Sequence, residues 1–99
     1  MRPTRTNLRE QEALLRAMIN AWDPIGLIAC GTPEDEYDCI THRVLGLLHS
    51  QADAAAISKS LATFLPYHFG SAPSAPEIEA FAVKATEAWA AEQERSADA

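Results

Sequence analysis

Apolar residues recur at helical spacing in four segments of the chain, which are separated by stretches containing Pro, Gly or Ser. In an α-helix this spacing places the apolar side chains on one face. Nineteen of the 99 residues are alanine, the strongest helix former, and runs of β-branched residues are scarce. The pattern predicts an all-α protein, a compact single domain over residues 1–99 with about four amphipathic helices in a bundle or an irregular array.

The boundaries of the first helix follow from a capping residue and a proline. Asn7, with Glu10 three residues later, resembles a capping box, so we expect the helix to begin there after a flexible arm at residues 1–6. Pro24 cannot donate a backbone hydrogen bond and restricts the residue before it, so the helix is expected to end near Trp22.

The connection that follows, IGLIACG at residues 25–31, is too short for a helix and is expected to cross the core as an extended or turn-like segment. Thr32 has the character of an N-cap, and Pro33 suits the first position of a helix. The second helix is therefore expected to run from Pro33 to about His49. Its apolar stripe contains Tyr37, Ile40, Val44, Leu47 and Leu48.

Two further helices are expected in the second half of the chain. The third starts at Ser50 and ends at Pro66, and a loop over residues 66–75 leads to the fourth, which begins at Pro76 with Ser74 or Ala75 as its cap. The end of the chain, residues 94–99, is expected to be flexible. The expected aromatic anchors of the core are Trp22, Phe64, Phe81 and Trp89.

Charge narrows the class of partner. The net charge is −6, with four arginines against two glutamates in residues 1–20 and four cations against twelve acids in residues 21–99. This balance argues against direct nucleic-acid binding, which needs basic patches to neutralise phosphates. It favours a basic protein partner. No apolar run approaches the length of a membrane span, and no secretory signal is visible, so we expect a cytoplasmic protein that does not bind membranes.

Four carboxylates, Glu34, Asp35, Glu36 and Asp38, fall within five residues around Tyr37. Acidic residues stabilise the first turn of a helix, but four in this position exceed what capping needs. The excess charge predicts a patch for a basic partner. Tyr37 joins this patch as an aromatic anchor if it turns outward, whereas its place in the apolar stripe favours an inward position.

Asp35, Asp38, His42 and His49 lie near one line of the second helix, opposite its apolar stripe. Asp38 and His42 are four residues apart, a spacing that suits a divalent metal or an acid–base pair and is equally typical of a surface pair. The chain has no phosphate-binding loop, nucleophile elbow or CxxC pair. Its two cysteines, Cys30 and Cys39, are expected to be reduced, and no cofactor is expected.

The motifs WDPIG and DEYD carry a resemblance to known proteins. With Trp22, Asp23, Pro24, Ile25 and Gly26 in the first and Asp35, Glu36, Tyr37 and Asp38 in the second, residues 8 to about 65 resemble a small bacterial family of helical proteins of unknown function. Similar sequences also resemble the small immunity proteins that are encoded beside polymorphic or contact-dependent toxins.

Three hypotheses follow. The first is a non-enzymatic, cytoplasmic protein-binding module, and its most concrete form is an immunity protein that covers the basic surface of a nuclease toxin with its acidic patch. The second is a metal-binding protein or metal-dependent enzyme that uses Asp35, Asp38, His42 and His49. The third is a subunit of a homo-oligomer with no further chemistry.

Overall fold

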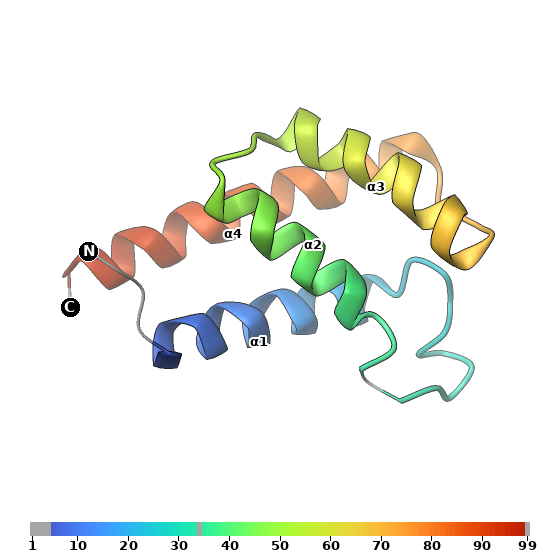
Figure 1. The fold of residues 1–99 in the computed structure, drawn as a ribbon, viewed down its shortest axis with the longest axis horizontal. Coiled ribbons are helices and arrows are strands. Elements are labelled where there is room, and N and C mark those ends of the chain that lie inside the picture. Colours follow the sequence, from blue (N-terminus) through green and yellow to red (C-terminus); the bar gives the residue numbers. More distant parts are fainter. Residues whose placement is uncertain (1–4, 34, 99) are drawn as a thin grey trace.

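Four helices make up the computed structural model, which describes residues 5–33 and 35–98 (Figure 1). They are α1 (Arg5–Trp22), α2 (Asp38–His49), α3 (Ala54–Phe69) and α4 (Ala75–Asp98). The described residues contain no strand, which confirms the predicted all-α class. The expected flexible ends fall partly on residues 1–4 and 99, which lie outside the described residues.

The helices form two closely packed pairs. α1 packs along α2, and α3 packs along α4, while smaller contacts join α1 to α4 and α2 to α3. Successive helices run in alternating directions, and the connection between α1 and α2 loops out at one end of the molecule (Figure 1). The connections over residues 50–53 and 70–74 are short and reverse the chain direction directly, whereas the connection between α1 and α2 takes up residues 23–37.

The apolar stripes of the sequence face one another in the core. The fully or almost fully buried apolar side chains are Leu15, Ile19, Tyr37, Ile40, Val44, Leu48, Ile57, Leu61, Leu65, Ile78, Phe81, Ala82 and Ala85. Of the expected aromatic anchors, Phe81 is buried, and Trp22, Phe64 and Trp89 are partly buried against the core. Burial of these side chains stabilises helices that would be marginal in isolation.

The first helix begins earlier than its capping pattern predicted. α1 starts at Arg5, so Asn7 lies inside the helix and the prediction of an N-cap at Asn7 was wrong. The end at Trp22 is confirmed. The amide of Asp23 still donates to the carbonyl of Ile19, and the chain then leaves the helix because Asp23 has a positive φ of 50°. Aspartate tolerates this left-handed conformation better than most residues.

The second helix begins later than predicted. The Thr32 hydroxyl donates to the carbonyl oxygen of Leu27 at 2.7 Å, so it belongs to the preceding turn and does not cap a helix at Pro33. Two further turns follow before α2 starts at Asp38, with Tyr37 at the N-cap position making no side-chain cap. The described residues Asp35 and Glu36 therefore lie in the connection, outside the first helical turn.

The boundaries of α3 also differ from the prediction. Asp53 is its N-cap, with its carboxylate accepting from the amide of Ala56 at 2.8 Å, whereas Ser50 ends α2. Pro66 lies inside the last turn and does not end the helix. Gly70, with a φ of 74°, closes the helix by donating its amide to the Pro66 carbonyl. This is the left-handed C-cap that glycine adopts without steric cost.

α4 starts at Ala75, one residue before the predicted start at Pro76. Ser74, one of the two predicted caps, accepts from the amide of Glu77 at 3.4 Å through its hydroxyl. The helix continues to Asp98, beyond the point where the chain was expected to fray at residue 94. Within the described ranges, no helix combines the length and apolar character that crossing a membrane requires.

Candidate functional site

The connection between α1 and α2 is organised by the carboxylate of Asp23. Its Oδ1 accepts from the hydroxyl of Tyr37 at 2.7 Å and from the amide of Ile28 at 3.0 Å, and its Oδ2 accepts from the amide of Ala29 at 3.0 Å. A carboxylate that accepts several hydrogen bonds stays ionised more readily. The Tyr37 hydrogen bond in particular lowers the pKa of Asp23 below its ordinary value of 3.8.

Tyr37 completes the same cluster from the other end of the connection. Its side chain is fully buried, and its hydroxyl accepts from the amides of Ile25 at 3.1 Å and Leu27 at 3.2 Å while donating to Asp23. Its ring packs edge-on against Phe69 at 5.8 Å between centroids. The inward alternative for Tyr37 is therefore the one observed, and this side chain offers no exposed ring to a partner.

This hydrogen-bonded cluster of Asp23 and Tyr37 unites the WDPIG and DEYD motifs in one structural unit. Trp22, the first residue of WDPIG, stacks on Phe81 of α4 with 4.4 Å between ring centroids and 9° between ring planes. The connection is thus a series of hydrogen-bonded turns. Its side chains Ile25, Leu27 and Ile28 are partly buried and pack against the core. Of the two predicted alternatives, extended or turn-like, the connection is turn-like. The expectation that it crosses the core was wrong, because it lies along the edge of the core.

The cluster predicts a specific dependence of stability on pH. The pKa of Asp23 is lower in the folded protein than its ordinary value of 3.8, so its contribution is present above that value and is lost as the pH falls through the folded pKa. Burial, and then the Asp23 hydrogen bond, raise the pKa of Tyr37 above 10.0. Its contribution is therefore present below pH 10.0 and is lost as the pH rises through the folded pKa.

Urea unfolding across the acid and alkaline range measures this effect. In Tyr37→Phe, the part of the stability loss at high pH that comes from ionisation of Tyr37 should disappear. The loss of stability at low pH should become smaller, because Asp23 then accepts one hydrogen bond fewer. The quantity to compare is the difference in the free energy of unfolding between the parent and the variant at each pH. Groups that titrate equally in both proteins cancel in this difference. Parallel curves at every pH would contradict the assigned coupling.

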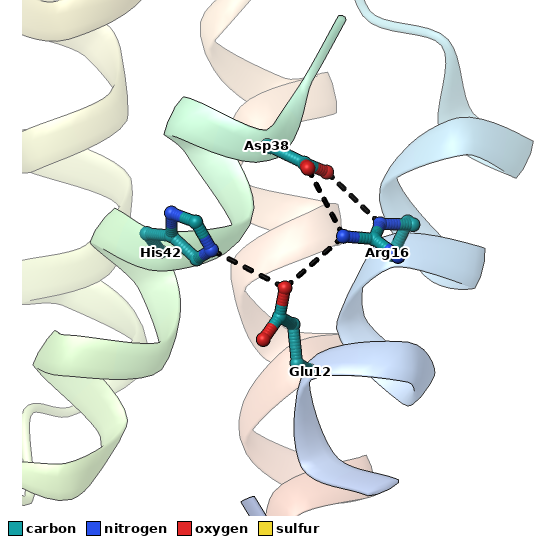
Figure 2. A network of polar contacts seen from close by, with 4 residues as sticks. All are labelled: Glu12, Arg16, Asp38 and His42. Carbon is teal, nitrogen blue, oxygen red and sulfur yellow. Dashed lines mark hydrogen bonds and ion pairs between the residues drawn. The ribbon is translucent and has the colours of Figure 1, made fainter. Parts of the chain in front are cut away.

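A second polar network joins α1 to α2 (Figure 2). Arg16 donates from Nε to Asp38 Oδ1 at 2.9 Å and from Nη2 to Asp38 Oδ2 at 3.0 Å, a two-pronged contact. Nη2 also donates to Glu12 Oε1 at 3.0 Å, and His42 Nε2 lies 3.3 Å from the same oxygen. The hydrogen bonds that Arg16 donates to Asp38 raise the pKa of Arg16, so the guanidinium remains charged.

This network gives a structural role to Asp38, which the sequence analysis placed in the acidic patch and among the candidate metal ligands. Asp38 is neutralised by Arg16, and its side chain is 28% exposed, so it adds little free charge to the surface. Partly exposed ion pairs contribute about 0–1 kcal/mol, and the two-pronged geometry favours the upper end of that range. Its role in the structure is to hold α1 against the start of α2.

The candidate metal ligands are not gathered in one place. Asp38 and His42 are engaged in the network of Figure 2, and Asp35 lies in a turn outside α2. His49 Nε2 lies 3.1 Å from Gln11 Oε1, and the His49 ring packs edge-on against Trp89 at 5.0 Å. Throughout residues 5–33 and 35–98, no group of three or more His, Cys, Asp or Glu residues could hold a metal ion.

What remains exposed of the predicted acidic patch is Asp35 and Glu36, which we call the acidic turn. Both residues are exposed, and Glu34 lies outside the described residues. The turn is held by main-chain hydrogen bonds, from the Glu36 amide to the Pro33 carbonyl at 3.2 Å and from the Asp38 amide to the Asp35 carbonyl at 3.1 Å. Directly after it, the buried Tyr37 anchors the chain to Asp23. The two charges are therefore presented on a fixed backbone.

The two cysteines lie on either side of the acidic turn in the sequence. Both are free, with Cys30 exposed in the connection and Cys39 partly buried at the start of α2. Burial raises the pKa of the Cys39 thiol, which reduces the population of the reactive thiolate.

Sequence reasoning missed Glu12 and Arg16, although both contribute to the network beside the acidic turn. Their spacing of four residues on α1 was the available signal, because such pairs face each other on a helix. Nothing in the spacing indicated that Asp38, 22 residues away, would complete the pair.

Comparison of the chain with protein-family models, curated proteins and solved structures gave no match.

Proposed function

We propose that this protein is a non-enzymatic binding module whose acidic turn docks on a basic surface of a protein partner. The observation that carries the proposal is the exposure of Asp35 and Glu36 on a backbone fixed by Tyr37 and Asp23. A loop that is already ordered loses less conformational entropy on binding, so more of the interaction energy appears as affinity. The net charge of −6 supports electrostatic steering toward a basic partner.

A toxin domain is the most concrete partner under this proposal, in keeping with the resemblance of WDPIG and DEYD to immunity proteins. Nucleases bind polyanionic substrates on basic surfaces, and an acidic inhibitor can occupy such a surface. Tyr37 is buried and Asp38 is paired with Arg16, so neither is part of the proposed contact. The proposal therefore rests on Asp35 and Glu36, which are exposed.

Purification of a tagged protein from its native cell, with the product of the adjacent gene as the first candidate, identifies the partner. We expect a partner that is basic and whose association rate falls steeply as salt is increased, because exposed charges are screened over about 8–10 Å at physiological ionic strength. Co-expression should then protect cells from a toxic partner. An acidic partner at this surface, or an association rate unaffected by salt, would sink the proposal.

A further inference from the structure

The middle of the chain has the opposite charge to the rest. Residues 39–76 contain the cations Arg43 and Lys59 and a single carboxylate, Asp53, in a chain whose net charge is −6. That carboxylate is used as the N-cap of α3. Asp38, which starts α2 just before this range, is paired with Arg16. The surface formed by α2 and α3 therefore presents Arg43 and Lys59 while its two carboxylates are already engaged.

A groove of about 480 Å³ lies on this surface, which we call the α2/α3 groove. Arg43 of α2 forms one wall. The other lining residues come from one face of α3: Ala56, Lys59, Ser60, Thr63, Phe64 and Tyr67. Their positions follow the i, i+3, i+4, i+7 spacing of a single helical face, and at 1.5 Å per residue they span about 17 Å. A groove of that length suits a segment of two to three helical turns.

The chemistry of the groove combines exposed aromatic surface with cations. Tyr67 is 89% exposed, far more than any other large aromatic side chain among the described residues. The Cζ of Arg43 lies 4.1 Å from the centroid of the Phe64 ring, which stacks on His68 with 15° between ring planes. Tyrosine and arginine are enriched where protein interfaces gain most of their binding energy.

The two cations of the groove retain free donor capacity. The described hydrogen bond of the Arg43 guanidinium is a long one, from Nη1 to Ser60 Oγ at 3.4 Å, although the group carries five N–H donors. Over residues 5–33 and 35–98, neither Arg43 nor Lys59 lies within ion-pair distance of a carboxylate. By contrast, Arg16 contacts two carboxylates.

We propose that the α2/α3 groove docks an amphipathic helix of a protein partner that carries carboxylates beside its apolar face. The apolar face would cover Phe64 and Tyr67, and the carboxylates would pair with Arg43 and Lys59, where charge-assisted and two-pronged contacts are available. This docking surface is independent of the acidic turn, since it lies on other elements and selects the opposite charge.

Other occupants fit less well. A second copy related by a twofold axis through the groove would bring Arg43 and Lys59 toward their own counterparts, and like charges repel. A nucleic acid would meet the same two cations and stacking rings, but the net charge of −6 opposes its approach. An acidic amphipathic helix matches the local charge without a long polyanionic backbone.

Selection from a displayed library of 16-residue helical peptides with randomised charged and apolar positions tests the proposal. We expect enrichment of peptides that combine Glu or Asp with aromatic or aliphatic residues at i, i+3, i+4 and i+7. Their affinity should fall about tenfold or more for Arg43→Glu with Lys59→Glu and for Tyr67→Ala, measured by fluorescence anisotropy. Because Tyr67 is exposed, Tyr67→Ala should leave the circular dichroism and melting temperature unchanged.

The matched control is Arg9→Glu with Lys84→Glu, which changes the net charge equally at exposed cations outside the α2/α3 groove. It should bind the selected peptides within about twofold of the parent. The proposal is overturned if no acidic amphipathic sequence is enriched, if the groove variants bind as tightly as the control, or if oligo-dT binds the groove more tightly than every selected peptide. A dimer by light scattering that Tyr67→Ala abolishes would assign the groove to a second copy instead.

Discussion

Replacing Tyr37 by Phe is expected to lower the free energy of unfolding by about 2–4 kcal/mol, although the aromatic ring stays in place. The substitution removes the donor to the Asp23 carboxylate at 2.7 Å and the acceptor for the amides of Ile25 and Leu27. Partly buried polar groups that lose a partner carry the cost of their desolvation, and hydrogen bonds to a charged group are the stronger ones. Equilibrium urea unfolding measures the change.

The chain supplies a matched control in its second tyrosine. Tyr67 is 89% exposed, so Tyr67→Phe removes the same atom from a hydroxyl that water already solvates, and its effect should stay within about 0.5 kcal/mol. A loss for Tyr37→Phe as small as that for Tyr67→Phe would show that the hydrogen-bonded cluster does not hold the connection between α1 and α2.

Replacing Phe81 by Ala is expected to cost about 3–5 kcal/mol, the usual range for a buried phenylalanine. Phe81 is 5% exposed, and its ring stacks on Trp22 of α1, so the substitution leaves a cavity where α4 meets α1. Urea unfolding gives the loss of stability, and near-ultraviolet circular dichroism reports the changed surroundings of Trp22.

Val83 provides the comparison two positions further along α4. It is 45% exposed, and we expect Val83→Ala to change the free energy of unfolding by less than about 1 kcal/mol. If the two alanine substitutions had equal effects, the assigned orientation of α4 would be wrong, because the face containing Phe81 would not be the buried one.

Periodicity in the sequence was enough to predict which faces are buried. Ile40, Val44 and Leu48 of α2 lie in the core, as do Ile57, Leu61 and Leu65 of α3. This success has a physical reason, since the side chains that share a helical face are set by local geometry alone.

The start of α2 could not be predicted in the same way. Thr32 and Pro33 have the residue types of a helix start, but the Thr32 hydroxyl bonds back to the Leu27 carbonyl. Local preference was overridden because the burial of Tyr37 fixes where the chain turns inward. Capping preferences of about 1 kcal/mol are smaller than the burial and hydrogen bonding of one tyrosine.

Local sequence patterns also could not predict which side chains pair with each other in the candidate site. Asp23 and Tyr37 are 14 residues apart, and Arg16 and Asp38 are 22 residues apart, so neither pair follows from helical spacing. The acidic composition around residue 35 was visible, but the division between supporting and exposed residues required the fold. The structure places Tyr37 and Asp38 in the support and leaves Asp35 and Glu36 exposed.

The most direct test of the proposed function is the affinity of the identified basic partner for two charge-reversed proteins, measured by isothermal titration calorimetry. One carries Asp35→Lys and Glu36→Lys, and the other carries Glu79→Lys and Glu87→Lys, an equal charge change at exposed positions of α4. We predict that the first binds at least about tenfold more weakly at unchanged stability, while the second stays within about threefold of the parent. Equal affinity of the two variants for the partner would contradict the assignment of the acidic turn as the binding surface.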